Sequence, residues 1–299
     1  SPVVPGSVAD KAQTAAVTDL NADSADVNET VTYTKVGSLV PSSSDGHFPG
    51  APTVVYPNDP SDATKVTPAG VPTVPGYTAH DPEGHVLTPG SSYQPSDPTK
   101  DTTITYTADK QNGSVSYVDD TTGKTLKTDS ISGTTGSKSS YSTSGSIADY
   151  KKQGYELVTD GYPADLKFDN DDTTDQNFTV HLKHRLTPVN PTAPQTPGTP
   201  INPDEPDGPK WPTSTNYDKT VNETISYVDQ NGQLVAKQHT DSVNFTRTVV
   251  VDNVTGEVIT SGAGTTAWTA TNGDTTFDAV VSPVVPGSVA DKAQTAAVT

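Results

Sequence analysis

Residues 116–126, SYVDDTTGKTL, decide the fold of this chain. A strand that carries Tyr117 runs into a turn of Asp, Thr and Gly and returns as a second apolar stretch. Gly123 can adopt the positive φ that a tight hairpin turn requires. The stretch therefore predicts a β-hairpin, and residues 226–235, SYVDQNGQLV, predict a second one in which Gly232 has the same role.

The residues that follow the first hairpin predict a short helix. In residues 141–162, YSTSGSIADYKKQGYELVTDGY, either Ser142 or Thr143 can cap the first turn. Ile147 and Tyr150 are three residues apart and so share one helical face, and Gly154 is a natural C-terminal stop. A hairpin, a short helix and further strands follow one another in the order of a β-grasp (ubiquitin-like) fold.

Strand patterns dominate the remainder of the chain. A β-branched residue, a hydroxyl residue and a tyrosine occur in succession four times, which places the first and third side chains on one face of a strand. The tyrosines of these motifs are Tyr33, Tyr106, Tyr117 and Tyr227. Residues 178–182, FTVHL, alternate in the same way. We expect the four tyrosines to lie in the cores of their modules.

The chain begins and ends with the same 18 residues, SPVVPGSVADKAQTAAVT, at 1–18 and at 282–299. A duplication of this length is not a chance event, and repeats at a fixed period are typical of tandem arrays. We therefore expect the chain to be a section of a longer array whose period is 281 residues.

These signals predict a mainly β fold with minor α content, in which β-grasp modules follow one another in an elongated arrangement. The expected divisions are a closing half-module at 1–35, a β-rich module at 36–110, a complete β-grasp module at 111–186, a Pro-rich linker at 187–218 and an opening half-module at 219–299. The last half-module lacks its final strand, which residues 19–35 of this or another chain could supply.

Composition limits the class of protein. The formal net charge of −18 disfavours nucleic acid and anionic membranes as partners. No apolar run is long enough to span a bilayer. Only 30% of the residues are hydrophobic, which favours several small modules over one large core. Cysteine is absent, so neither disulfides nor thiol chemistry is available. An acidic, cysteine-free repeat rich in Thr, Ser, Asp and Pro suits an exported bacterial surface protein.

No catalytic residue can be assigned. The chain has no G-x-S-x-G and no H-E-x-x-H motif. No histidine is placed to partner a nucleophile, and we expect His181 and His184 to be exposed polar residues at a strand end. The six histidines are His47, His80, His85, His181, His184 and His239. The sequence therefore predicts a protein that is not an enzyme.

One loop could hold a cation, although no metal ligand is assigned and no cofactor is required. Residues 168–178, FDNDDTTDQNF, gather four carboxylates in one loop, and oxygen ligands at alternate positions can bind Ca²⁺. The carboxylates belong to Asp169, Asp171, Asp172 and Asp175. The glycine and the final glutamate of an EF-hand are missing, so the pattern favours a solvated acidic turn between two strands over a calcium site.

Ligand-binding residues cannot be named from the sequence. Sugars are often bound by exposed aromatic rings. Trp268 alternates with threonines, as a core residue does, and Trp211 lies at the end of the Pro-rich segment, where it could anchor that segment or face a ligand. The acidic residues of 202–208, NPDEPDG, fit solvation of a linker.

Several stretches resemble the mucus-binding (MucBP, Mub) repeats of surface adhesins from lactic acid bacteria. They are residues 32–65, 116–126, 141–162, 168–185 and 223–235. The resemblance implies β-grasp modules placed end to end in a cell-wall-anchored parent protein, an extracellular location at the bacterial surface, and adhesion to host mucus. Some members of the family contact immunoglobulins. No single ligand-binding residue of the family can be transferred to this sequence.

We therefore expect an adhesion repeat that binds host mucin, through its glycans, with weak contacts that an array multiplies. Two alternatives remain open. One is a module that binds immunoglobulin or another host protein along an exposed strand edge. The other is a passive stalk that projects a distal adhesin.

Overall fold

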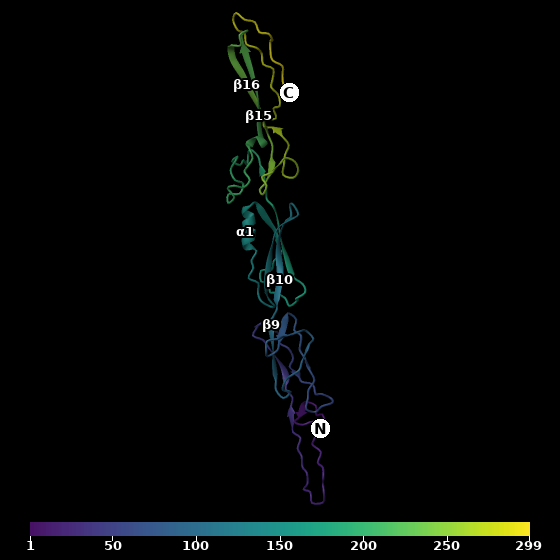
Figure 1. The fold of residues 1–299 in the computed structure, drawn as a ribbon. Coiled ribbons are helices and arrows are strands. Elements are labelled where there is room, and N and C mark those ends of the chain that lie inside the picture. The colour runs from purple at the N-terminus through teal and green to yellow at the C-terminus, as the bar shows by residue number, and fades with distance from the viewer. The chain divides into compact units, whose positions relative to one another are not determined.

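The computed structural model describes residues 1–299, and strands make up most of its regular structure (Figure 1). One α-helix, α1 (Ser144–Lys152), and one turn of 3₁₀-helix, η1 (Ser214–Asn216), complete it. Neither helix has the length and hydrophobicity that crossing a bilayer demands. Residues 1–116, 128–141 and 162–179 form one compact unit, and residues 117–127, 142–161 and 180–299 form the other.

Residues 110–184 form a four-stranded sheet in the order β11-β10-β13-β12. Its strands are β10 (Lys110–Asp119), β11 (Lys124–Thr134), β12 (Tyr155–Asp160) and β13 (Gln176–His184). The first strand, β10, and the last, β13, run in the same direction: Ser114 contacts Asn177, and further along Asp120 N–H donates to the Leu182 carbonyl. This strand order, with α1 between the second and third strands, is the β-grasp fold that the sequence predicted.

The sequence pattern explains this hairpin and helix. Alternate residues of β10 are buried, so one face of the strand lies in the core. Helix α1 buries Ile147, and the ring of Tyr150 lies 5.8 Å from Tyr117 and 5.5 Å from Tyr155. Thr143 stands at the expected N-cap position, but its hydroxyl donates to Asp160 and does not cap the helix.

Residues 36–110 repeat the same strand order without a helix. The five-stranded sheet runs β4-β3-β9-β6-β7, and a separate pair joins β5 to β8. The strands are β3 (Ser38–Ser42), β4 (Val54–Val55), β5 (Ala69–Gly70), β6 (Tyr77–His80), β7 (Val86–Leu87), β8 (Ser92–Tyr93) and β9 (Thr102–Ala108). Opening strand β3 is parallel to closing strand β9, and the core beneath them includes Leu39, Tyr56 and Tyr106.

Residues 1–35 form an antiparallel pair, β1 (Ser7–Ala9) with β2 (Tyr33–Lys35), and the chain between them makes the long purple loop of Figure 1. Val8 belongs to the buried cluster of residues 36–108. The segment expected to close a preceding module thus contributes side chains to the module that follows it.

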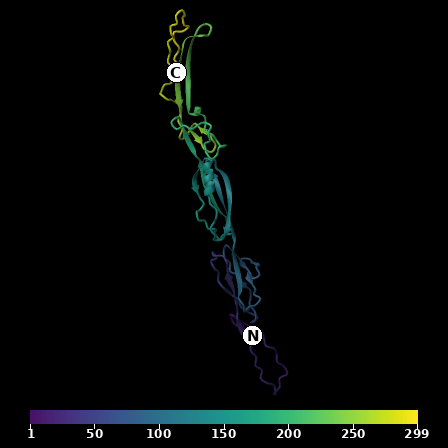
Figure 2. The ribbon, with the colours of Figure 1, turned by 90° about the vertical axis from the view of Figure 1, so that its left-hand side faces the viewer.

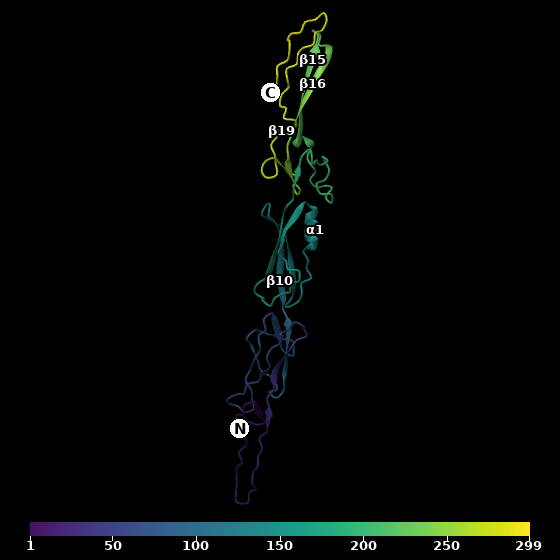
Figure 3. The ribbon, with the colours of Figure 1, turned by 180° about the vertical axis from the view of Figure 1, so that it is seen from behind.

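Residues 186–299 contain two further sheets, β14-β17-β18 and β15-β16-β19. Their strands are β14 (Leu186–Val189), β15 (Asp218–Val228), β16 (Leu234–Thr246), β17 (Val249–Asp252), β18 (Val258–Ile259) and β19 (Thr269–Ala270). Strands β15 and β16 form the long hairpin predicted around Gly232, with β19 on β16 (Figure 3).

The Pro-rich stretch 187–218 differs from the extended linker that we expected. Val189 pairs with Val249, and Ile201 and Tyr217 are buried in a core with Val249 and Val251. Apolar residues placed between the prolines therefore fold the stretch onto β17. The exact module boundaries stay predictions.

Candidate functional site

His184 at the end of β13 lies between two carboxylates. Its Nε2 is 2.6 Å from Asp119 at the end of β10, and its Nδ1 is 2.7 Å from Asp252 at the end of β17. All three side chains are less than a tenth exposed. Burial lowers the pKa of His184, but the bonds and charges of the two carboxylates outweigh burial and raise the pKa overall.

This cluster resembles the Asp–His pair of a hydrolase, but its histidine cannot act as a general base. A general base needs a ring nitrogen within reach of a nucleophile. Both nitrogens of His184 are already bonded to carboxylates. The group therefore joins β10, β13 and β17, and the prediction that His184 is an exposed strand-end residue is wrong.

The other histidines lie on or near the surface, each beside an acceptor. His181 is partly exposed, as expected, and its Nδ1 is 2.7 Å from Asp120. The remaining neighbours are Asp45 for His47, Thr107 for His80, Asp81 for His85 and Glu223 for His239.

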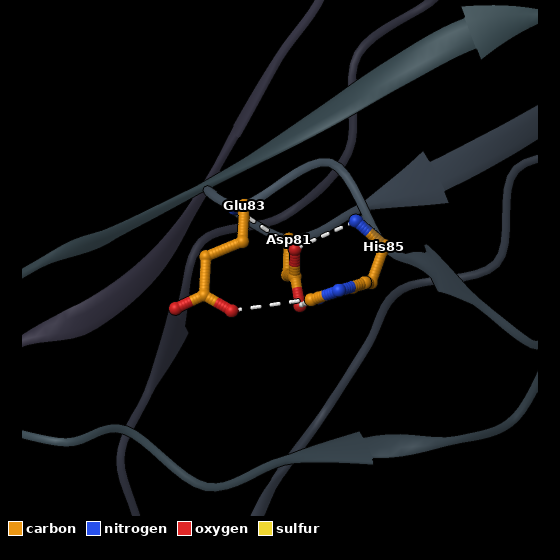
Figure 4. Close-up of side chains that lie close together, drawn as sticks. All are labelled: Asp81, Glu83 and His85. Atoms are coloured by element: carbon orange, nitrogen blue, oxygen red, sulfur yellow. Dashed lines mark hydrogen bonds and ion pairs between the residues drawn. The ribbon is translucent and has the colours of Figure 1, made fainter.

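One cluster of metal-ligating side chains escaped the sequence analysis. Asp81, Glu83 and His85 place their ligand atoms within 4.8 Å of one another on the turn between β6 and β7 (Figure 4). The Asp81 carboxylate accepts from the amides of Glu83 and His85, and the side chains of Glu83 and His85 are mostly exposed. Burial raises the pKa of Asp81, but these donors and the His85 ring lower it overall. The cluster is explained as a carboxylate-stabilised turn.

The acidic loop at residues 168–178 also uses its carboxylates in local hydrogen bonds. Asp169 accepts from the Asp171 amide, and Asp171 accepts from the amide and hydroxyl of Thr173. Asp172 points away from these turns and accepts from Gln111 at 2.6 Å. These bonds are those of an acidic turn, and calcium binding by this loop stays an open possibility.

The aromatic residues divide between core and surface. Tyr106 and Tyr117 are fully buried, as predicted, whereas Tyr33 and Tyr227 are only half-buried. Trp211 packs on the core around Val189. The half-buried ring of Trp268 lies under two cations, with Arg247 4.4 Å and Lys219 5.2 Å from the ring centre. Neither tryptophan is an open platform for a sugar.

A cavity of about 210 Å³ lies beside β6, β7 and β9 in the first unit. Its wall combines apolar residues and tyrosines, among them Val74, Tyr77 and Tyr106, with the carboxyls of Asp109 and Asp172. Burial and the neighbouring Asp172 raise the pKa of Asp109. The hydroxyl of Thr78 donates a hydrogen bond to Asp109, which lowers this pKa but does not cancel the rise. The sequence could not identify this site, because Asp109 and Asp172 meet only after folding.

Comparison with known proteins places these features in a family. Residues 111–184 match the mucin binding domain, and residues 212–299 match the Muc B2-like domain. No curated protein matches the chain. The solved structure of Mub-RV is 35% identical, with 63% of this chain and 91% of that chain covered and a TM-score of 0.46. The type 2 repeat of the mucus binding protein MUB from Lactobacillus reuteri is 33% identical, with 63% and 90% covered and a TM-score of 0.43. With about a third of the residues identical over nine-tenths of those repeats, and with both domain matches, this chain belongs to the Mub family of mucus-binding repeats.

Proposed function

We propose that this chain is a non-enzymatic, extracellular adhesion repeat that binds host mucin and contacts its glycans. The observation that carries the proposal is the pair of family matches, to a mucin binding domain at 111–184 and to a Muc B2-like domain at 212–299. Both families consist of binding domains and not of enzymes. The same membership supports our further proposal that the parent protein is anchored to the cell wall and places this chain at the bacterial cell surface.

The cavity beside β6 and β9 is the best-supported place for a glycan contact. Its 210 Å³ is below the ~300–1,000 Å³ of sites for drug-sized ligands, which suits a single sugar unit. Carboxylates accept hydrogen bonds from sugar hydroxyls, and the apolar wall can receive the C–H face of the ring. Because Asp109 and Asp172 would repel a sialic acid carboxylate, a neutral sugar fits this cavity.

Each contact of this kind is weak. The net charge of −18 opposes approach to mucin, which carries sialic acid and sulfate, so attraction has to come from local polar bonds. Several sites on one array raise the avidity by a factor of ~10² to 10⁴ when the geometry allows simultaneous binding. We therefore expect a clear gain in mucin binding when the chain is displayed at high density on beads.

The test compares intact mucin with mucin stripped of its O-glycans, using the full chain and two variants. D172N removes a carboxylate from the cavity wall, and D175N removes the same charge from an exposed position in the same loop. Loss of a bond to a charged acceptor should weaken mucin binding about tenfold or more for D172N, and D175N should bind as the unsubstituted chain does. Melting curves of both variants establish that they are folded.

Four results would contradict the proposal. Equal binding to stripped and intact mucin would exclude a glycan contact, and equal binding by the two variants would exclude this cavity. Binding to immunoglobulin without binding to mucin would favour the alternative host-protein partner. If the bead-displayed chain binds neither mucin nor immunoglobulin, the repeat acts as a spacer.

Thermal melting with and without a chelator tests whether the loop at residues 168–178 binds calcium, since a bound ion raises the melting temperature.

A further inference from the structure

Two cationic side chains meet over one aromatic ring on the sheet of β15, β16 and β19. Strands β15 and β16 form the long green hairpin of Figure 2, and β19 pairs with β16. Lys219 on β15 lies opposite Phe245 on β16, and Phe245 lies opposite Ala270 on β19, so the three side chains share one face of the sheet. Arg247 and Trp268 are each two residues from this row, which places them on the same face.

The ring of Trp268 holds the two cations close together. The guanidinium carbon of Arg247 is 4.4 Å from the centre of the ring, and the ammonium nitrogen of Lys219 is 5.2 Å from it. The face of an aromatic ring attracts a cation, but the ring has no net charge and cannot neutralise one. Two like charges over one ring also repel each other. An anion that reaches both cations therefore removes an unfavourable interaction.

No acidic side chain of the protein supplies that anion. Neither cation forms an ion pair, although the chain has 36 acidic residues and only 18 basic ones. The two acidic residues of β15 are engaged elsewhere. Asp218 lies on the opposite face, where it accepts from Asn244 at 2.7 Å, and Glu223 is 4.0 Å from His239. An anionic ligand can therefore reach both cations without displacing a carboxylate of the protein.

Arg247 is held with the outer edge of its guanidinium group free. Its Nε donates to the Asn216 carbonyl at 2.7 Å, and its backbone amide donates to the Tyr217 carbonyl at 3.0 Å. The two terminal nitrogens have no acceptor in the protein. Arg247 is also half-buried, so its charge is less well solvated than that of an exposed residue. A guanidinium group held in this way can bind two oxygens of a sulfate or a carboxylate through parallel hydrogen bonds.

We propose that Lys219, Arg247 and Trp268 form an anion site that binds the sulfate ester or the carboxylate of an acidic sugar. Arg247 donates to two oxygens of the anion, Lys219 provides the second positive charge, and Trp268 positions both cations. A sulfate ester has three free oxygens and can bond to both cations at once, so it should bind more tightly than a carboxylate, which has two. The part that this site plays in adhesion rests on the proposed mucin binding, but the site is separate from the cavity beside β6 and β9.

The indole N–H resonance of Trp268 reports binding at this site directly. The chain has two tryptophans, so the resonance that persists in W211F belongs to Trp268. Three probes share one sugar core: lactose 3′-sulfate, 3′-sialyllactose and lactose itself. Titrated into the full chain, lactose 3′-sulfate should shift this resonance to saturation with the lowest Kd, 3′-sialyllactose should bind more weakly, and lactose should cause no shift.

Two substitutions separate the contributions of the cations. K219Q should raise the Kd for lactose 3′-sulfate about fivefold, because one of the two positive charges is lost. R247K keeps its charge but loses the planar fork of N–H groups, and it should raise the Kd about tenfold. K237Q removes an exposed lysine from the same hairpin and should leave the Kd unchanged. Melting curves establish that the variants are folded, and Lys219 is itself exposed.

Equal shifts with all three probes, or no shift with any of them, would overturn the proposal. The same Kd in K219Q, R247K and K237Q would overturn it too. Binding of 3′-sialyllactose alone, weakened by K219Q, would support the site with a carboxylate as its ligand. D172N should bind lactose 3′-sulfate as the unsubstituted chain does, so a failure of this site and a failure of the cavity proposal are told apart.

Discussion

At the scale of single residues, the buried histidine between two carboxylates is the group whose partial removal should cost the most stability. Asp119 and Asp252 both approach His184 within 2.7 Å, where water cannot solvate their charges. Such a group contributes little if it is replaced as a whole by apolar residues, but removing one member leaves charges buried without compensation.

The first prediction compares two histidines on the same strand. H184Q should lower the free energy of unfolding by about 3–5 kcal/mol, because two buried carboxylates lose their cation. H181Q removes an equally short bond to Asp120 from an exposed position and should cost less than about 1 kcal/mol. Urea unfolding measures both values. A similar loss of stability in the two variants would refute the view that His184 is a buried cation held between two carboxylates.

The second prediction concerns pH. Because the folded-state pKa of His184 is raised, the protonated ring stabilises the fold fully below its unfolded pKa of about 6.5. This stability is lost as the pH rises through the folded-state pKa. Urea unfolding at about pH 6 and about pH 9 should therefore show a loss of stability that is smaller in H184Q. An equal loss in H184Q would assign the effect to other groups.

Sequence reasoning reached some of these residues and missed others for a physical reason. Tyr106 and Tyr117 were predicted to be core residues because alternation within one strand determines the buried face. His184 could not be predicted, since its burial depends on Asp252, 68 residues further along the chain. The cavity carboxyls of Asp109 and Asp172 come together in the same way, from two distant segments.

At the scale of elements, helix α1 is followed, after its C-cap Gln153, by a glycine that the fold requires. Gly154 has φ +98°, and a Cβ there would lie 2.5 Å from the Asn253 carbonyl oxygen. G154A should therefore destabilise the protein by about 1–3 kcal/mol. G145A is the control, since it lies in α1 with no atom within 4 Å of the new Cβ, and it should stabilise by up to about 1 kcal/mol. Thermal melting shows whether each variant is more or less stable than the unsubstituted protein. Destabilisation by both variants would contradict the special requirement for glycine at position 154.

Elements with strong local signals were predictable, and those held by distant contacts were not. The hairpins around Gly123 and Gly232 and the helix before Gly154 all formed where the sequence placed them. The fold of residues 187–218 could not be read from periodicity, because Val189, Ile201 and Tyr217 are spaced irregularly among prolines. Their burial arises only when β17 is present.

At the scale of the whole molecule, the charge of −18 determines how binding responds to salt. Raising the ionic strength from about 10 mM to about 150 mM shortens the screening length from about 30 Å to about 8 Å and reduces the repulsion between this chain and anionic mucin. Mucin binding, measured by surface plasmon resonance, should therefore strengthen over this range. Weaker binding at higher salt would mean that ion pairs drive adhesion. Mucin stripped of sialic acid and sulfate is the control and should show little change.

The parallel pairing of the first and last strands has a mechanical consequence. In residues 38–108 the chain enters through β3 and leaves through β9, and these strands are neighbours that run in the same direction. A pulling force on the two ends loads the backbone bonds between them together, in shear, instead of opening them one after another. If the parent protein is anchored to the cell as proposed, the drag on a bacterium in moving mucus would pass through the polypeptide, and this strand order would resist it by shear.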